Sequence, residues 1–219
     1  MKEEIKNLVN ISRKIGSYPE FVQGGGGNTS VKIDDNLMVI KASGYLLKDM
    51  TKSDGFAFVN YNDINDHIKN DGISSNTEDG FSNFIKEKTS KIDNYPALKP
   101  SIETGFHALL PYKYIVHTHS VYSNILCCSS EGKEIVQKLF PHSTWVKYAN
   151  PGRDITIEIG KATKDKGSDI IFMQNHGIIV CADNASDAEK LHESVNNKII
   201  NHFNISSDYK LEEVSLDID

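Results

Sequence analysis

The sequence is poor in cysteine and has no long hydrophobic run, and each shortage argues against a class of protein. The three cysteines are odd in number, and Cys127 and Cys128 are adjacent. This pattern argues against a disulfide-stabilised secreted scaffold and indicates a reducing compartment. No apolar stretch approaches the roughly 20 residues that a membrane-spanning helix needs. We therefore expect a cytoplasmic protein that does not enter a membrane.

An excess of positive charge is also missing. The chain has 24 Lys and Arg against 30 Asp and Glu, a net charge of -6 at pH 7. Surfaces that bind nucleic acids or anionic lipids without specificity are basic, so we expect neither partner. Part of the acidic excess lies near the C-terminus, at Glu212, Glu213, Asp217 and Asp219, and it therefore says little about a substrate.

The remaining composition is typical of one globular domain. With 219 residues, 38% hydrophobic and 25% charged, the chain is long enough for a sizeable core, and nothing requires two domains. We expect one domain over residues 1–205, followed by an acidic tail over residues 206–219.

The spacing of apolar residues predicts the main elements. Ile5, Leu8 and Ile15 follow a helical period that ends at Gly16. We expect strands over 31–33, 37–40 and 56–61, a strand that carries His117 and His119, and helices over 101–110, 122–128 and from 186 onward. Residues 62–95 are polar, with one helix indicated near Phe81 and no chemistry expected. Because strands and helices mix without regular βαβ alternation, we expect an α/β fold with an antiparallel or mixed sheet.

Three histidines suggest a metal site. Side chains two apart on a strand leave the same face, so His117 and His119 can reach one point. His176 lies in a tight turn between two further apolar runs. Three neutral imidazoles leave a divalent ion one open position, which is typical of a catalytic site. The alternative is that the pair is half-buried packing and His176 a simple turn residue.

Three other segments have features that favour the binding of an anion. The run Gly24-Gly25-Gly26-Gly27 with Asn28 can expose backbone N–H groups to an anion, although a flexible loop has the same composition. Ser43-Gly44 forms a second polar turn, and Ser101 is expected as the N-cap of a helix, where the helix dipole favours negative charge. Together they indicate phosphate or carboxylate binding. No Gly-Lys-Ser/Thr follows the glycines, so this is not a P-loop.

Glu103 has two interpretations. In the first turn of the expected helix its charge stabilises the helix dipole. Near a metal ion it could instead exchange a proton with a substrate. The spacing does not choose between these roles. Further along, Ser186 and Glu189 are expected as the capping box of the last helix.

Five motifs in order resemble those of the class II aldolase/adducin family. They are Gly27-Asn28-x-Ser30, Ala42-Ser43-Gly44, Pro100-Ser101-Ile102-Glu103, His117-Thr118-His119 and Asn175-His176-Gly177. The amino-acid sequence of these motifs looks most like that of aldolase domains that in other proteins are fused to a short-chain dehydrogenase. The resemblance implies a three-layer α/β/α fold around a mostly antiparallel sheet, usually in a homotetramer with sites between subunits.

The resemblance also implies an activity and a set of roles. The family includes zinc-dependent L-fuculose- and L-rhamnulose-phosphate aldolases, which cleave a ketose phosphate through a zinc-stabilised enediolate of dihydroxyacetone phosphate. The implied zinc ligands are His117, His119 and His176, with manganese or cobalt as other suitable ions. Glu103 takes the acid/base position. Asn28, Ser43, Gly44 and Ser101 are implied to hold the phosphate of the sugar-phosphate substrate.

The chain departs from the family pattern in two places, because Gly25 and Ile102 stand where a hydroxyl residue is usual. Lys41 could compensate with its charge. The tyrosine proton donor does not align securely, and the candidates are Tyr122, Tyr148 and Tyr209. The same scaffold resembles sugar-phosphate epimerases, a dehydratase and 3-oxo-sugar-acid phosphate decarboxylases, and these stay open. A non-catalytic adducin-like interaction domain is a further alternative.

Overall fold

A computed structural model describes residues 1–70, 77–164 and 167–206. The tail expected over 206–219 lies almost entirely outside these residues. Within them, the strands form one sheet in the order β4-β3-β2-β1-β5-β8-β7-β6. The strands are β1 (Asn28–Lys32), β2 (Leu37–Lys41), β3 (Phe56–Asn60), β4 (Thr89–Ser90), β5 (Tyr114–Thr118), β6 (Thr144–Val146), β7 (Ile170–Met173) and β8 (Gly177–Ala182). Neighbouring strands are antiparallel except β6 and β7, which are parallel.

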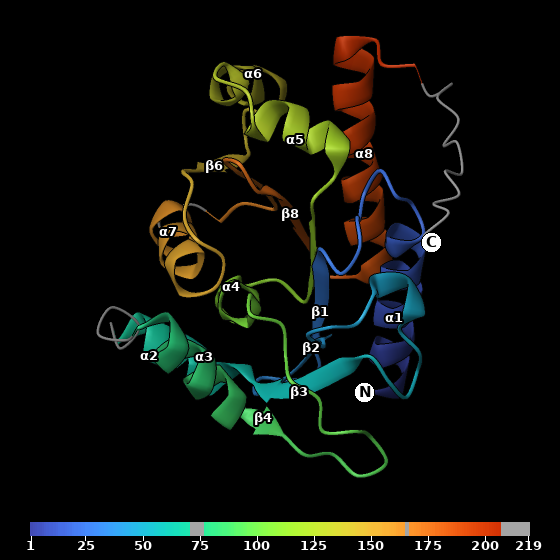
Figure 1. The fold of residues 1–219 in the computed structure, drawn as a ribbon, viewed down its shortest axis with the longest axis vertical. Coiled ribbons are helices and arrows are strands. Elements are labelled where there is room, and N and C mark those ends of the chain that lie inside the picture. Colours follow the sequence, from blue (N-terminus) through green and yellow to red (C-terminus); the bar gives the residue numbers. More distant parts are fainter. Residues whose placement is uncertain (71–76, 165–166, 207–219) are drawn as a thin grey trace, which may run out of the picture.

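Helices cover both faces of this sheet, which gives the expected three-layer α/β/α fold (Figure 1). One face carries α1 (Lys2–Gly16) and α8 (Ala185–Phe203), with α5 (Val121–Cys127) and α6 (Gly132–Leu139) toward one end. The other face carries α2 (Tyr61–Lys69), α3 (Glu78–Glu87), α4 (Thr104–Leu109) and α7 (Arg153–Thr163). A short 3-10 turn covers Leu47–Asp49.

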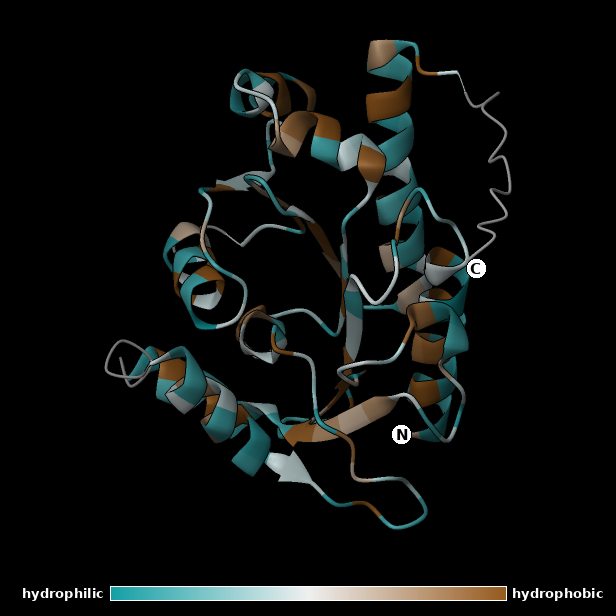
Figure 2. Ribbon diagram, viewed as in Figure 1, coloured by the Kyte–Doolittle hydropathy of each residue, from teal (hydrophilic) through white to brown (hydrophobic). Residues whose placement is uncertain are grey.

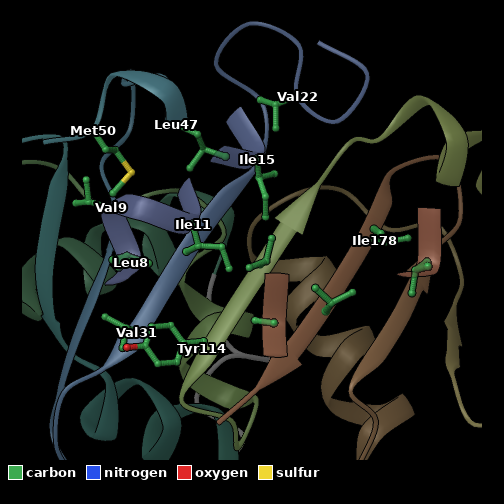
Figure 3. Packing of buried hydrophobic residues seen from close by; sticks show 14 of the residues in the cluster. Leu8, Val9, Ile11, Ile15, Val22, Val31, Leu47, Met50, Tyr114 and Ile178 are labelled. Atoms are coloured by element: carbon green, nitrogen blue, oxygen red, sulfur yellow. The ribbon is translucent and has the colours of Figure 1, made fainter. Parts of the chain in front are cut away.

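Strand alternation explains why the core has two sides. On β5, Val116 packs toward α1 and α8, whereas Ile115 packs toward α4 and α7. Figure 3 shows the first side, where Leu8 and Ile11 of α1 meet Val31 of β1. Each such side chain, fully buried, contributes roughly 1.5–3 kcal/mol through loss of contact with water. The sheet is therefore anchored from both faces.

The helices that cover the sheet are amphipathic. Figure 2 shows hydrophobic and hydrophilic residues alternating along α1 and α8, and the buried members of α1 are Ile5, Leu8, Val9, Ile11, Ser12 and Ile15. The exposed residues of α1 are all polar or charged. Within residues 1–70, 77–164 and 167–206, no helix combines the length and apolar character required to cross a membrane.

Three local expectations are wrong. The helix expected from Ser101 begins at Thr104, because the Ser101 hydroxyl accepts hydrogen bonds from Asn28 Nδ2 and the Glu103 N–H instead of capping a helix. The last helix begins at Ala185, capped by the side chain of Asn184, which accepts from the Asp187 N–H; Ser186 does not cap it.

Residues 62–95 also differ from the single surface helix expected there. Apart from residues 71–76, which lie outside the described part of the chain, they contain most of α2, all of α3 and the short strand β4. Ile64, Phe81 and Ile85 are buried against Met38 and Val59 of the sheet. This segment therefore forms part of the core.

Candidate metal centre

The structure brings His117, His119 and His176 together. His117 lies in β5, His119 follows directly after it, and His176 lies in the turn between β7 and β8. Each offers one ring nitrogen, and these nitrogens all lie within 4.8 Å of one another. The Nε2 atoms of His117 and His119 are 3.1 Å apart.

A glycine allows the His176 turn to approach β5. A Cβ atom on Gly177 would lie 2.3 Å from the carbonyl oxygen of Thr118, which is closer than any real contact of this kind. Asn175, on the other side of His176, has a positive φ of 54°, a conformation that asparagine tolerates better than most residues. The Asn175-His176-Gly177 sequence therefore lets the turn lie directly against the strand that carries the other two histidines.

Hydrogen bonding fixes the orientation of the His117 ring. Its Nδ1 lies 2.9 Å from the carbonyl oxygen of Ile178, which can only accept, so Nδ1 carries the proton. Burial lowers the pKa of His117 to about 3, although the Glu103 carboxylate opposes the shift, so the ring is neutral at pH 7. Its Nε2 lone pair faces the other two histidines. Burial also lowers the pKa of His119.

Glu103 reaches the same point from the residue before α4. Its Oε2 accepts a hydrogen bond from Asn28 Nδ2 at 2.6 Å and lies 3.5 Å from His117 Nε2. Its Oε1 lies 3.1 Å from His176 Nε2. Burial alone would raise the pKa of Glu103, but the His117 and His176 rings and the Asn28 N–H outweigh it and hold the pKa below its usual range. The group is therefore ionised at neutral pH.

Asn28 is the first residue of β1 and pairs with His117 of β5. Besides contacting Glu103, its Nδ2 lies 3.2 Å from the Ser101 hydroxyl, and its Oδ1 contacts Nε2 of His107. Both ends of the amide are therefore engaged. His107, from α4, also lies 2.7 Å from the Ser30 hydroxyl through its Nδ1. A buried hydrogen-bond network thus orients the Asn28 side chain, which in turn holds Glu103.

The other expected phosphate residues lie beside this network. The Ser43 N–H donates to the carbonyl of Lys99, and the Ser101 N–H donates to that of Lys41, so the two segments run next to each other. Ser43 and Gly44 are exposed, and Gly44 has a φ of +83° with open space where a Cβ would be. Lys41 Nζ donates to the carbonyl of Gly25 at 3.3 Å.

Helix α8 supports β5 from its opposite face. Thr118 lies between the two strand histidines, and its hydroxyl is 2.9 Å from Nε2 of His192. The Ser120 hydroxyl donates to Oδ1 of Asn196 at 2.5 Å. All four side chains are buried, so this segment is hydrogen-bonded on one face while its other face presents the histidines.

The sequence motifs did not identify several residues that lie near the site. His107 belongs to none of the sequence motifs, although it lies four residues after Glu103, the residue that precedes α4. Gly26 lies against His119, since a Cβ there would be 2.9 Å from Nδ1 of that ring. His192 and Asn196 had no sequence signal. Of the tyrosine candidates, Tyr122 is buried and Tyr148 exposed; Tyr209 lies outside the described residues.

The donor set fits a divalent metal ion. Two imidazole Nε2 atoms 3.1 Å apart need a proton or a cation between them, because their lone pairs otherwise repel. Nδ1 of His176 is buried and has no hydrogen-bond partner among the described residues. Three imidazoles with a nearby carboxylate suit zinc and similar ions.

The chain is similar to known proteins along most of its length. The family described as Class II Aldolase and Adducin N-terminal domain matches residues 6–199. The chain is 26% identical over 196 residues to the L-fuculose phosphate aldolase of Methanocaldococcus jannaschii, a match that covers 84% of this chain and 86% of the relative. It is 31% identical over 186 residues to YuxG, an uncharacterized oxidoreductase of Bacillus subtilis (strain 168), covering 80% of this chain. The chain spans 26% of the length of YuxG.

A solved structure has the same fold as this chain. The N-terminal class II aldolase domain of a conserved protein from Thermoplasma acidophilum superimposes with a TM-score of 0.79 and 27% identity. The match covers 91% of this chain and 93% of that one. With the family match over residues 6–199, this chain belongs to the class II aldolase and adducin N-terminal domain family.

Proposed function

We propose that the chain is a metal-dependent aldolase that cleaves or forms a ketose phosphate, with dihydroxyacetone phosphate as one product or substrate. The observation that carries the proposal is the convergence of three imidazole nitrogens and an ionised carboxylate on one point. We further propose zinc as the resident ion, a cytoplasmic location and a homotetrameric assembly.

His117, His119 and His176 would hold the ion. When bound, it supplies a Lewis acid that stabilises negative charge on substrate oxygens. The protein contributes rigidity: the Ile178 carbonyl fixes one ring, and α8 holds the strand from behind. Such supporting contacts keep the ligand nitrogens aimed at one point and are typically worth 10- to 100-fold in metal affinity.

Glu103 would move the proton. Its Oε2 is held by Asn28, which leaves Oε1 as the atom that accepts a proton from the substrate and returns it. Because the carboxylate is ionised at neutral pH, it is in the protonation state that can accept a proton. Asn28 thus orients the base in addition to the phosphate contact that the family resemblance implies for it.

The substrate phosphate would lie near Ser43, Gly44 and Ser101. The Ser43 N–H is bonded to the Lys99 carbonyl, so the contacts left for a phosphate at this exposed turn are the Ser43 hydroxyl and the Gly44 N–H, where a Cβ would meet open space. Lys41 supplies a positive charge at the edge of the cradle. This charge would offset the hydroxyl groups absent at Gly25 and Ile102.

The test combines elemental analysis with proton exchange. Purified protein is analysed for bound metal and then incubated with dihydroxyacetone phosphate in deuterated water, observed by NMR. We expect near-stoichiometric metal and deuterium at the hydroxymethyl carbon, with both lost in His119→Ala. Metal without exchange would overturn the aldolase proposal in favour of an epimerase, dehydratase or decarboxylase. A metal-free protein would favour a non-catalytic, adducin-like role.

A further inference from the structure

A second cavity lies away from the metal centre, between α2 and α7. We call it the α2–α7 cavity. It has a volume of about 740 Å³ and is lined mainly by these two helices, with Lys32 of β1 and Leu109 of α4 at its inner side. Lys32 is the last residue of β1, whereas Asn28 at the metal centre is the first. Four residues of strand separate them by roughly 13 Å. None of the three histidines lines this cavity.

The lining is strongly basic although the whole chain is acidic. Lys32, Lys69, Lys161 and Lys164 line the cavity, and among the described residues no Asp or Glu does. Glu158 pairs with Lys161 at 2.8 Å on the exposed side of α7 and neutralises part of one charge. In a chain of net charge -6, a cavity with four ammonium groups selects for anions.

Lys32 is the innermost of these groups and has no carboxylate partner in the described part of the chain. Its Nζ lies 4.8 Å above the centre of the Tyr61 ring and donates to the carbonyl of Leu110. Burial lowers its pKa to about 8, and the charge of Lys69 contributes in the same direction. A partly buried ammonium without a counterion is costly, and an anionic ligand would relieve that cost.

The rest of the lining suits an organic molecule better than a bare ion. Ile68, Leu109 and Ile157 give the cavity apolar walls, and Tyr61 adds an aromatic ring. Oδ1 of Asn65 is buried without a hydrogen-bond partner among residues 1–70, 77–164 and 167–206. It would accept from a ligand hydroxyl. The volume lies in the 300–1,000 Å³ range of small-molecule sites.

We propose that the α2–α7 cavity binds a small organic phosphate, with the phosphate group among the four lysines and the carbon skeleton against Tyr61 and the apolar wall. The site is separate from the metal centre and is independent of the reaction that takes place there.

Pyridoxal 5'-phosphate is a suitable probe because it joins a phosphate to an aldehyde. The full-length, metal-loaded protein is incubated with the probe. The Lys32 amine condenses with the aldehyde carbon, losing water, and borohydride reduces the imine to a stable amine. Peptide mass spectrometry then locates the label. We expect Lys32 to be labelled well above the exposed Lys133, and inorganic phosphate to protect it. Any label on Lys41 reports separately on the metal centre.

Two controls separate phosphate recognition from simple amine reactivity. Pyridoxal, which lacks the phosphate, should label Lys32 about tenfold less, since one charge-assisted contact is worth about that factor. Lys161→Gln with Lys164→Gln, at the outer part of α7, should reduce labelling by the phosphate probe by a similar factor. Equal labelling by both aldehydes, no protection by phosphate, or no effect of the double variant would overturn the proposal.

Discussion

At the scale of single residues, Glu103 is a buried carboxylate with one oxygen, Oε2, held by Asn28 and the other, Oε1, without a hydrogen-bond partner among the described residues. Gln is nearly the same shape and still accepts from Asn28 through its amide oxygen, but it cannot take up a proton. For Glu103→Gln we expect bound metal to remain and the exchange of dihydroxyacetone phosphate protons to slow by roughly 10²- to 10⁴-fold. Elemental analysis and NMR measure the two effects on one sample. An unchanged exchange rate would remove Glu103 from the proton transfer.

Gly26, which lies against His119, and its chain neighbour Gly25 offer a matched pair of substitutions. A Cβ on Gly26 would lie 2.9 Å from Nδ1 of the His119 ring, whereas one on Gly25 would meet nothing within 4 Å. For Gly26→Ala we expect the ring to be displaced and zinc affinity to fall roughly tenfold, by analogy with the loss of supporting contacts. Gly25→Ala should bind zinc as the natural chain does. Competition with a chromogenic chelator gives both affinities, and equal values for the two variants would contradict the expected role of the contact.

At the scale of elements, α4 depends on close packing against α7 and α3. A Cβ on Gly105 would lie 2.6 Å from the Thr156 hydroxyl and 2.9 Å from the Phe81 ring. On Gly160 of α7, the added Cβ would meet only the tip of Leu109, at 3.1 Å. We expect Gly105→Ala to lower the free energy of unfolding by about 1–3 kcal/mol through overpacking.

Gly160→Ala is the control for that substitution. It should be neutral or slightly stabilising, because alanine favours a helix by up to about 1 kcal/mol over glycine and the Leu109 side chain can move. Urea denaturation of the two variants measures the difference. A Gly105→Ala protein as stable as Gly160→Ala would show that α4 can shift away from its neighbours.

Elements with a regular apolar pattern could be predicted from the sequence, and α1 is the clearest. The same applies to β5, where the two-residue period of the strand predicts that His117 and His119 share a face. By contrast, α2 was missed because its three apolar residues, Tyr61, Ile64 and Ile68, stand at helical spacing but within a nine-residue stretch that is otherwise polar. The start of α4 was misplaced because Ser101 uses its hydroxyl in contacts with Asn28 and Glu103, and these depend on tertiary structure.

In the candidate site, too, some features could be predicted from the local sequence and others depend on the tertiary structure. The histidines and Glu103 were recognisable from their motifs, and their convergence follows from strand pairing that no local pattern encodes. The sequence predicts a strand that begins at residue 31, yet β1 begins at Asn28, which lies opposite His117. The hydrogen bonds of His192 to Thr118 and of Asn196 to Ser120 join residues more than 70 positions apart, so only the fold reveals them.

At the scale of the whole molecule, buried histidines make stability depend on pH. Burial lowers the pKa of His192 to about 4 from its ordinary 6.5. Between these values the unfolded chain binds a proton that the folded chain does not. The free energy of unfolding should therefore be constant above pH 6.5 on this account and fall below it, by about 1.4 kcal/mol per pH unit for each such histidine.

Urea denaturation between pH 5 and pH 8 tests this expectation. In His192→Phe the slope below about pH 6.5 should decrease by roughly 1.4 kcal/mol per unit, whatever the overall stability of the variant. Identical slopes in His192→Phe and the natural chain would mean that His192 takes up its proton without unfolding.

The sheet ends in very short strands, and this bears on how copies of the chain associate. β4 at one edge has two residues and β6 at the other has three. A strand that short exposes few unpaired N–H and C=O groups, so it offers a poor template for a strand from another molecule. Edge-to-edge polymerisation is thereby disfavoured. The described sheet edges therefore favour association of copies through helices and loops rather than through strand pairing.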